Sequence, residues 1–189
     1  MTNTANFRLH PNTSSLLLID VQDRLIASMK PKVFDNVRAN INRLSQAAQL
    51  LSVHTVVTEQ YPKGLGHTEA AIKEGLHPEL PIIEKVDFNA ACVEEVKEAL
   101  HANATEEVIL TGMEAHICVF QTAIGCLEAG LRVWVAMDAI CSRSKDNWRQ
   151  SLEMMQQAGA VVAPTESILF AWLGKAGGEE FKAISKSIR

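Results

Sequence analysis

Short apolar runs that alternate with longer amphipathic segments constrain the fold of this chain more than any other feature. Residues 16–19 and 108–112 are nearly continuous in apolar residues. Such runs are typical of strands that are buried on both faces of a parallel sheet. Residues 33–51 instead repeat apolar side chains, Val33 among them, at intervals of three and four, which predicts an amphipathic helix. The alternation of the two patterns predicts an α/β fold with helices on both faces of a parallel sheet.

The remaining segments continue this alternation. Further strands are predicted at residues 54–58, 81–85, 131–137 and 160–163. Further helices are predicted at residues 22–29, 90–101, 116–129, 144–158, 165–173 and after Gly177-Gly178. The expected N-caps of three of these helices are Asn89, Ser144 and Thr165. Residues 59–76 show no clean periodicity and are predicted to form a long loop with one helical turn, which is typical of lids and binding loops.

Composition narrows the class of protein. The chain has 189 residues, of which 47% are hydrophobic and 21% charged, and we find no repeat or linker, so one domain over residues 1–189 is expected. The net charge is −4 and no cluster of Lys and Arg occurs, which argues against a nucleic-acid partner. No secretion signal or bilayer-length apolar run is present, so no membrane partner is expected. Four cysteines without CxxC spacing favour a reducing compartment, and we expect a cytoplasmic location.

Cys118 occupies a position that favours a nucleophile. It is predicted to lie in the first turn of the helix at residues 116–129, directly after the strand at residues 108–112. Free backbone N–H groups and the positive end of the helix dipole meet there, and this setting lowers the pKa of a thiol. The alternative is that Cys118 is a small buried core residue, which is common for a free cysteine.

Two more residues with complementary chemistry fall on the same edge of the predicted sheet. Asp20 ends the first strand and Lys85 ends the third, while Cys118 follows the fourth. In an open parallel sheet, ligands bind outside the carboxyl ends of the strands. Each residue alone has a simpler explanation, since Asp20 could cap a helix and Lys85 could be a solvated edge residue. Together they favour covalent acyl transfer, which needs a nucleophile, a base and a cation.

Several motifs resemble those of the isochorismatase-like cysteine hydrolase superfamily. They comprise residues 18–22, Glu84-Lys85 with Phe88, and residues 112–119. Segments at residues 58–62, 138–144 and 165–167 make the chain most similar to the isochorismatase domain-containing proteins within that superfamily. The resemblance implies a three-layer Rossmann-like fold with a six-stranded parallel sheet.

The resemblance also implies a catalytic triad of Asp20, Lys85 and Cys118. Asp20 would accept the thiol proton, Lys85 would hold Asp20 ionised, and Cys118 would attack a carbonyl carbon. The backbone N–H groups of Glu114 and Cys118 would form the oxyanion hole. In the family a cis peptide bond, here Met113–Glu114, directs the Glu114 donor.

Departures from the superfamily pattern exclude some activities. Nicotinamidases carry a metal-binding Asp-x-His segment after the second strand, whereas this chain has Glu59-Gln60-Tyr61-Pro62, so we expect no metal and no other cofactor. Gln60, Tyr61 and Phe88 are expected to line the substrate pocket, although Tyr61 could simply pack beside Pro62. True isochorismatases lack the nucleophilic cysteine, which argues against vinyl ether hydrolysis here. His116 is expected on the pocket wall or the surface.

We therefore expect a metal-free cysteine hydrolase that cleaves the C–N bond of an amide-type small-molecule substrate through an acyl-thioester on Cys118. The alternative is a non-catalytic or interaction protein that keeps the fold. The helix over residues 119–127 is apolar almost all round, which is typical of a core helix or of a subunit contact. On this basis we expect a homo-oligomer, a dimer or larger.

Overall fold

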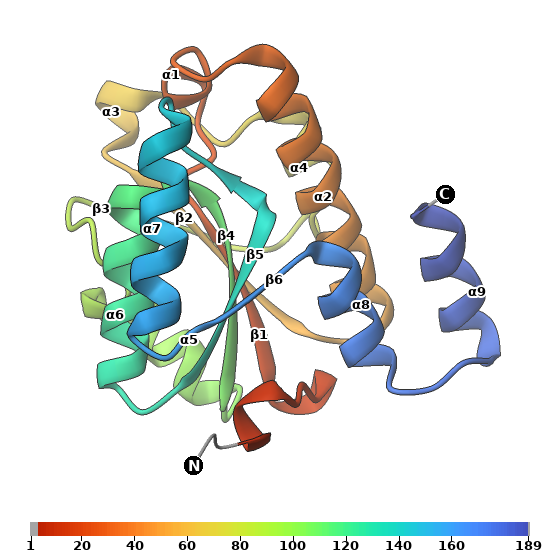
Figure 1. The fold of residues 1–189 in the computed structure, drawn as a ribbon. Coiled ribbons are helices and arrows are strands. Elements are labelled where there is room, and N and C mark those ends of the chain that lie inside the picture. The colour runs from red at the N-terminus through yellow and green to blue at the C-terminus, as the bar shows by residue number, and fades with distance from the viewer. Residues whose placement is uncertain (1–3, 189) are drawn as a thin grey trace.

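The computed structural model describes residues 4–188 and has three layers (Figure 1). A six-stranded sheet in the order β3-β2-β1-β4-β5-β6 forms the middle layer, and every neighbouring pair is parallel. The predicted fold class is therefore confirmed. The strands are β1 (Ser14–Ile19), β2 (His54–Gln60), β3 (Ile82–Lys85), β4 (Glu107–Met113), β5 (Arg132–Cys141) and β6 (Val161–Ala163).

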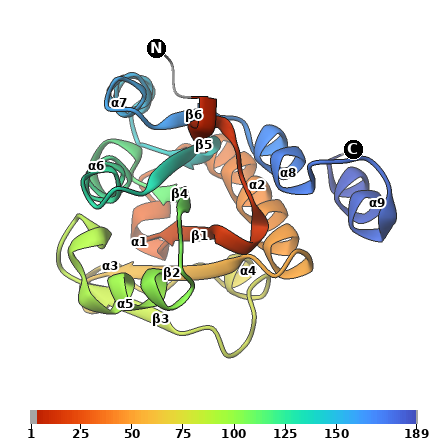
Figure 2. The ribbon, with the colours of Figure 1, turned by 90° about the horizontal axis from the view of Figure 1, so that it is seen from below.

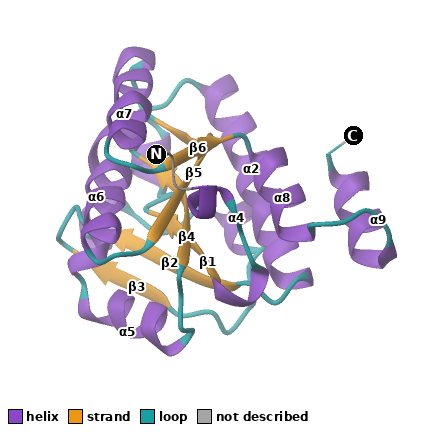
Figure 3. Cartoon of the chain, turned by 60° about the horizontal axis from the view of Figure 1, so that its bottom comes forward, coloured by secondary structure: helices purple, strands orange, loops and turns teal. Residues whose placement is uncertain are grey.

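Helices cover both faces of the sheet, as Figures 2 and 3 show. One face carries α2 (Pro31–Leu50), α4 (Ala70–Lys73), α8 (Thr165–Leu173) and α9 (Gly178–Ser187). The other carries α5 (Glu94–Ala102), α6 (Phe120–Glu128) and α7 (Lys145–Gln157). The single turns α1 (Asp23–Ile26) and α3 (Pro62–Leu65) lie at one end of the sheet. Within residues 4–188, no helix has both the length and the apolar character needed to cross a membrane.

The strand β1 shows why the apolar runs lack polar alternation. All six of its residues are buried. Leu16 and Leu18 belong to the core under α2, whereas Leu17 and Ile19 belong to the core under α5, α6 and α7. Because successive side chains of a strand point to opposite faces, a strand covered on both faces needs apolar residues at every position.

The strands β2 and β5 are longer than predicted. β2 continues through Gln60 instead of ending at Thr58. β5 was predicted to end before Asp138, but it continues to Cys141 after a register shift against β4 between Leu110 and Gly112. The prediction failed because Asp138 is a polar residue inside the strand. β6 pairs only with residues 134–136 of β5, so the last half of β5 extends beyond its neighbour.

Several helix predictions also need correction. The helix predicted over residues 90–101 is divided into a 3-10 turn, Ala90–Cys92, capped by Asn89, and α5. Residues 59–76 contain the short turns α3 and α4. Val33 is 43% exposed, and its neighbour Phe34 takes the buried position. Thr165 does not cap α8, because its N–H and hydroxyl both donate to Asp138 instead.

The predicted cap of α7 is confirmed, since the Ser144 hydroxyl accepts a hydrogen bond from the Asn147 N–H. The helix predicted over residues 116–129 begins instead as a single π-helical turn, Ala115–Val119, which continues into α6. The segment predicted as a helix at residues 22–29 contains the short turn α1.

Gly112 provides a stability test of the junction between β1 and β4. Its φ is +109°, and a Cβ atom there would overlap the backbone carbonyl of Ile19. We expect Gly112→Ala to lower the free energy of unfolding by about 3 kcal/mol or more, because a left-handed conformation and a backbone clash add together. Gly130→Ala is the matched control, since Gly130 has φ +82° and no atom within 4 Å of the added Cβ. Urea unfolding curves of equal midpoint for the two variants would contradict the clash.

Candidate active site

Asp20, Lys85 and Cys118 come from three strands that end at the same edge of the sheet. Asp20 directly follows β1, Lys85 is the last residue of β3, and Cys118 lies in the π-helical turn after β4. The chain moves outward from β1 through β2 to β3 and then returns to β4 on the other side of β1. Such a reversal of strand order leaves a crevice at the carboxyl ends of the strands.

The Lys85 ammonium is held by three acceptors in the interior. Its Nζ donates to Asp20 Oδ2 at 2.7 Å, to Gln60 Oε1 at 2.7 Å and to the Asp87 carbonyl at 3.0 Å. The side chains of Asp20 and Lys85 are both fully buried. An ammonium has three N–H donors, so Lys85 has none left to satisfy. The geometry gives Lys85 a fixed position as a buried positive charge.

The Asp20 carboxylate is oriented from two sides. Oδ2 accepts from Lys85, and Oδ1 accepts from the Thr58 hydroxyl at 2.7 Å. Asp20 has a φ of +52°, and its N–H donates to the Thr58 carbonyl at 3.1 Å. A left-handed conformation at a non-glycine residue costs free energy and persists only where the surrounding contacts enforce it. Thr58 was not identified from the sequence, because a threonine at a strand end gives no catalytic signal.

Cys118 is 5% exposed and belongs to the apolar core beneath α6. Burial raises the pKa of its thiol to about 12, and the negative charge of Asp20 contributes in the same direction, while Lys85 opposes them. The predicted lowering of this pKa at a helix start is therefore wrong. Desolvation and a neighbouring carboxylate both disfavour a thiolate, and here they outweigh the favourable charges. At neutral pH the thiol is protonated, so any nucleophilic role requires a base.

A hydrogen bond and an ion pair connect the start of the turn that carries Cys118 to the segment after β5. The Met113–Glu114 peptide bond is cis. The Glu114 side chain is buried, and its carboxylate accepts from the Arg143 N–H at 2.9 Å and pairs with the Arg143 guanidinium at 3.1 Å. These contacts fix the orientation of the residue whose backbone N–H was predicted to contribute to the oxyanion hole.

His116 lies in the same turn but bonds away from the thiol. Its Nδ1 is 2.9 Å from Ser142 Oγ, and its Nε2 is 3.2 Å from Asn147 Nδ2. Both ring nitrogens are thus engaged, one by Ser142 after β5 and the other by Asn147 in the first turn of α7. This arrangement agrees with the expectation that His116 is not the base for Cys118.

The three expected pocket residues differ in exposure. Tyr61 and Phe88 are 55% and 50% exposed, and Tyr61 borders a cavity of about 520 Å³ next to Lys85. Gln60 is buried, and its side chain bridges Lys85 and the Val86 carbonyl at 2.7 Å each. Gln60 is therefore placed to position the ammonium. A substrate contact by these three residues stays a prediction.

Gln22 holds Gln60 in turn. Its Oε1 accepts from the Gln60 N–H at 2.7 Å, and its Nε2 donates to the carbonyls of Gln60 and Gly66 at 3.0 and 2.6 Å. Gln22 is fully buried. These contacts connect the segment after β1 to the end of β2, a supporting role that the sequence did not reveal.

Glu59, the first residue of the segment that departs from the nicotinamidase metal-binding pattern, lies near the end of β2, and hydrogen bonds hold its carboxylate. Glu59 accepts from the Thr68 N–H and hydroxyl at 2.6 and 2.7 Å, and its other oxygen lies 3.0 Å from His67 Nδ1. Burial raises the pKa of Glu59, but the bonds from Thr68 and His67 outweigh it and lower that pKa below its ordinary value. Across residues 4–188, no three His, Cys, Asp or Glu residues gather in a way that could hold a metal ion.

Comparison with known proteins gives the family. Residues 14–167 match the isochorismatase domain. The chain belongs to the isochorismatase family. This chain is 35% identical to isochorismatase domain-containing protein 2 of Bos taurus over 184 residues. The match covers 96% of this chain and 86% of that protein.

Solved structures of similar proteins share this fold. A ribonuclease structure from Caenorhabditis elegans is 38% identical with a TM-score of 0.89, covering 96% of this chain and 92% of that one. A YcaC structure from Pseudomonas aeruginosa, described with a covalent acrylamide, is 25% identical with a TM-score of 0.84, covering 95% and 91%. The resemblance that the motifs predicted is thereby confirmed.

A double-mutant cycle tests whether the buried pair acts as a unit. We expect Asp20→Asn and Lys85→Met each to lower the free energy of unfolding by about 3–5 kcal/mol, because each leaves a buried charge uncompensated. The double variant is expected to lose much less than the sum of the two. The exposed pair of Glu179 and Lys182 is the control and should show little coupling. Additive losses at Asp20 and Lys85 in urea unfolding would contradict the coupling.

Proposed function

We propose that this protein is a metal-free cysteine hydrolase that cleaves the C–N bond of an amide-type small molecule through an acyl-thioester on Cys118. The observation that carries this proposal is the buried Asp20–Lys85 pair, whose charges both act on the protonated thiol of Cys118. A base, a cation and a nucleophile thus share one water-poor site, which is the combination that covalent acyl transfer requires.

In the first half of the proposed reaction, Asp20 takes the thiol proton while the Cys118 sulfur attacks the substrate carbonyl carbon. The carbonyl oxygen becomes negative and accepts hydrogen bonds from the backbone N–H groups of Cys118 and Glu114. The C–N bond then breaks, and the leaving amine takes the proton from Asp20. An acyl-thioester remains on Cys118.

In the second half, water attacks the thioester carbonyl as Asp20 accepts one of its protons. The C–S bond breaks, the acid is released, and the sulfur regains a proton. Lys85 has no donor free for substrate, so its role is to keep a positive charge beside Asp20 and the developing thiolate. Gln60 and Thr58 hold that charge pair in place.

The relatives support a hydrolase but leave the substrate open. The covalent acrylamide described for the Pseudomonas aeruginosa relative indicates that this fold can hold an attached electrophile. The ribonuclease description of the Caenorhabditis elegans relative would call for a long cationic track on this chain, whose net charge is −4. We therefore favour a small carbonyl compound over RNA.

A non-catalytic role is the second candidate, and the raised pKa of Cys118 favours it. Because burial and Asp20 raise the pKa of Cys118, the thiol is protonated at pH 7 and is unreactive without a base. The two candidates differ in whether Asp20 acts as the base.

Further expectations from the sequence accompany this proposal. We keep a single domain, a cytoplasmic location, no cofactor, no nucleic-acid or membrane partner and a homo-oligomeric state as predictions. The apolar character of α6 is partly explained within the chain, since Thr122, Ala123 and Cys126 are buried against the sheet and its neighbours. Phe120 and Leu127 are partly exposed on α6, and we expect them to form the predicted subunit contact.

The nucleophile is tested by removing the sulfur. We expect Cys118→Ala to abolish both turnover and the acyl adduct that intact-mass spectrometry detects after incubation with a panel of small amides, imides and activated esters. Cys126→Ala is the matched control, because Cys126 is a buried cysteine on the following helix and should keep its turnover. Full turnover by the Cys118 variant would reject the mechanism.

The base is tested by alkylation with iodoacetamide. Because the raised pKa confines the thiolate to high pH, the alkylation rate of Cys118 should rise about tenfold per pH unit from pH 7 to pH 10 without a plateau. Asp20→Asn removes the charge that raises this pKa and leaves Lys85, which lowers it. Alkylation at pH 8 should therefore increase about tenfold or more, while turnover falls by roughly 10²–10⁴-fold.

Asp23→Asn is the control for this experiment, since Asp23 is exposed and lies three residues further along the chain. The Asp23 variant should change neither the alkylation rate of Cys118 nor the rate of turnover. Equal turnover of the Asp20 variant and the wild type would favour the non-catalytic candidate. A plateau of the wild-type alkylation rate near pH 8.5 would contradict the raised pKa of Cys118.

A further inference from the structure

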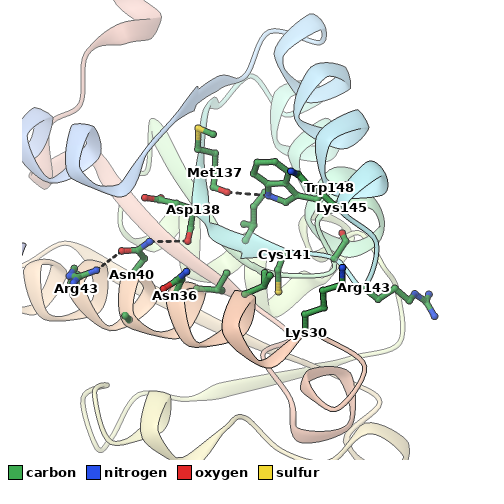
Figure 4. Close-up of a pocket in the computed structure, with 15 residues that line it drawn as sticks. Lys30, Asn36, Asn40, Arg43, Met137, Asp138, Cys141, Arg143, Lys145 and Trp148 are labelled. Atoms are coloured by element: carbon green, nitrogen blue, oxygen red, sulfur yellow. Dashed lines mark hydrogen bonds between the residues drawn. The ribbon is translucent and has the colours of Figure 1, made fainter.

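A second cavity, of about 600 Å³, lies between α2 and α7 (Figure 4). Its floor is formed by the last half of β5 and the two residues after it, which contribute Met137, Asp138, Ile140, Cys141, Ser142 and Arg143. The cavity exists because β6 ends opposite Ala136 while β5 continues to Cys141. Neither Asp20, Lys85 nor Cys118 lines it, so this cavity is separate from the proposed catalytic site.

The walls of this cavity are largely apolar. Val37 and Ile140 are buried there, and Val33 and Trp148 are partly exposed toward it. The floor offers few free polar groups. The Trp148 indole donates to the Met137 carbonyl at 3.1 Å, and the Asn40 amide donates to the Asp138 carbonyl at 2.9 Å, as the dashed lines in Figure 4 show. An apolar cavity of this size with a few polar groups at its rim is typical of a small-molecule site.

The charged residues around the cavity are mostly positive. Lys30, Arg43, Arg143 and Lys145 line it, against one carboxylate, that of Asp138. Asp138 Oδ1 already accepts two hydrogen bonds from the first residue of α8, both at 2.7 Å. This local excess of cations contrasts with the net charge of −4 of the whole chain.

Two of the four cations are available to a ligand. Arg43 donates to Asn40 and to the Ser187 carbonyl, and Arg143 pairs with Glu114. For Lys30 and Lys145, no carboxylate of residues 4–188 lies within ion-pair distance. Lys145 is also the first residue of α7, where the helix dipole favours an anion.

We propose that the cavity between α2 and α7 binds a small carboxylate with an aromatic or branched apolar body. The apolar part would rest against Val33, Ile140 and Trp148, and the carboxylate would meet Lys30 and Lys145. A second copy of the chain fits less well. A two-fold contact would place this cationic rim against itself, and like charges repel.

Benzoate is the probe for this site, and Trp148 is its reporter. In ¹H–¹⁵N spectra of the full chain, the three tryptophans give three indole signals, and Trp148→Phe assigns one of them. Trp134 and Trp172 are 5% and 3% exposed and serve as internal controls. We expect benzoate to shift the Trp148 indole signal alone. Benzyl alcohol, which lacks the charge, and inorganic phosphate, which lacks the apolar body, should bind at least about tenfold more weakly.

Charge reversal tests the two lysines. We expect Lys30→Glu combined with Lys145→Glu to weaken benzoate binding about tenfold or more. Lys32→Glu combined with Lys182→Glu makes the same change in net charge at exposed residues that do not line the cavity, and it should change the affinity less than about twofold. Arg143 is left intact because it holds Glu114.

Three results would overturn the proposal. The first is no shift of the Trp148 signal with benzoate at millimolar concentration. The second is equal binding of benzoate and benzyl alcohol, which would show that the cations do not contribute. The third is a dimer in sedimentation velocity that Lys30→Glu with Lys145→Glu dissociates, which would identify the cavity as a contact between copies of the chain.

Discussion

The buried ion pair between Asp20 and Lys85 is the interaction on which the rest of the site depends. Taking two charges out of water is costly, and their attraction offsets this only when further hydrogen bonds satisfy both groups. Here Thr58, Gln60 and the Asp87 carbonyl complete the bonds, and Gln22 fixes Gln60. The ends of β1, β2 and β3 are therefore joined by one polar network inside an apolar protein. Such a network tolerates little rearrangement, which is why it can hold a base and a cation in fixed positions.

The charges of this pair also act on the Cys118 thiol, together with burial, which has the largest effect. Burial and Asp20 raise the pKa of Cys118, so the resting sulfur carries its proton. In the proposed mechanism, the carboxylate that disfavours the thiolate at rest accepts the proton when a substrate carbonyl is in place. The pairing of Glu114 with Arg143 then has a purpose, because it fixes the turn that would receive the negative charge of the oxygen.

The end of β5 and the residues after it connect the proposed catalytic site to the second cavity. β5 extends beyond β6, and the two residues that follow it contribute to both places. Cys141, Ser142 and Arg143 line the cavity, while Ser142 and Arg143 also hold His116 and Glu114 in the turn before α6. The segment between β5 and α7 is thus shared. One side of it faces the cationic cavity and the other side supports the turn of Cys118.

The sequence by itself determined the layers of this protein and the edge of the sheet at which the proposed catalytic residues lie. Continuous apolar runs such as Leu16–Ile19 report burial on both faces, and parallel strands place their carboxyl ends together, so Asp20, Lys85 and Cys118 had to meet at one edge. Only the tertiary structure decided the extension of β5 past Asp138, the inward direction of Gln60 and the raised pKa of Cys118. Periodicity records which residues avoid water along one element. The pKa of a thiol and the partner of an amide instead depend on groups that are distant in the chain and adjacent only after folding.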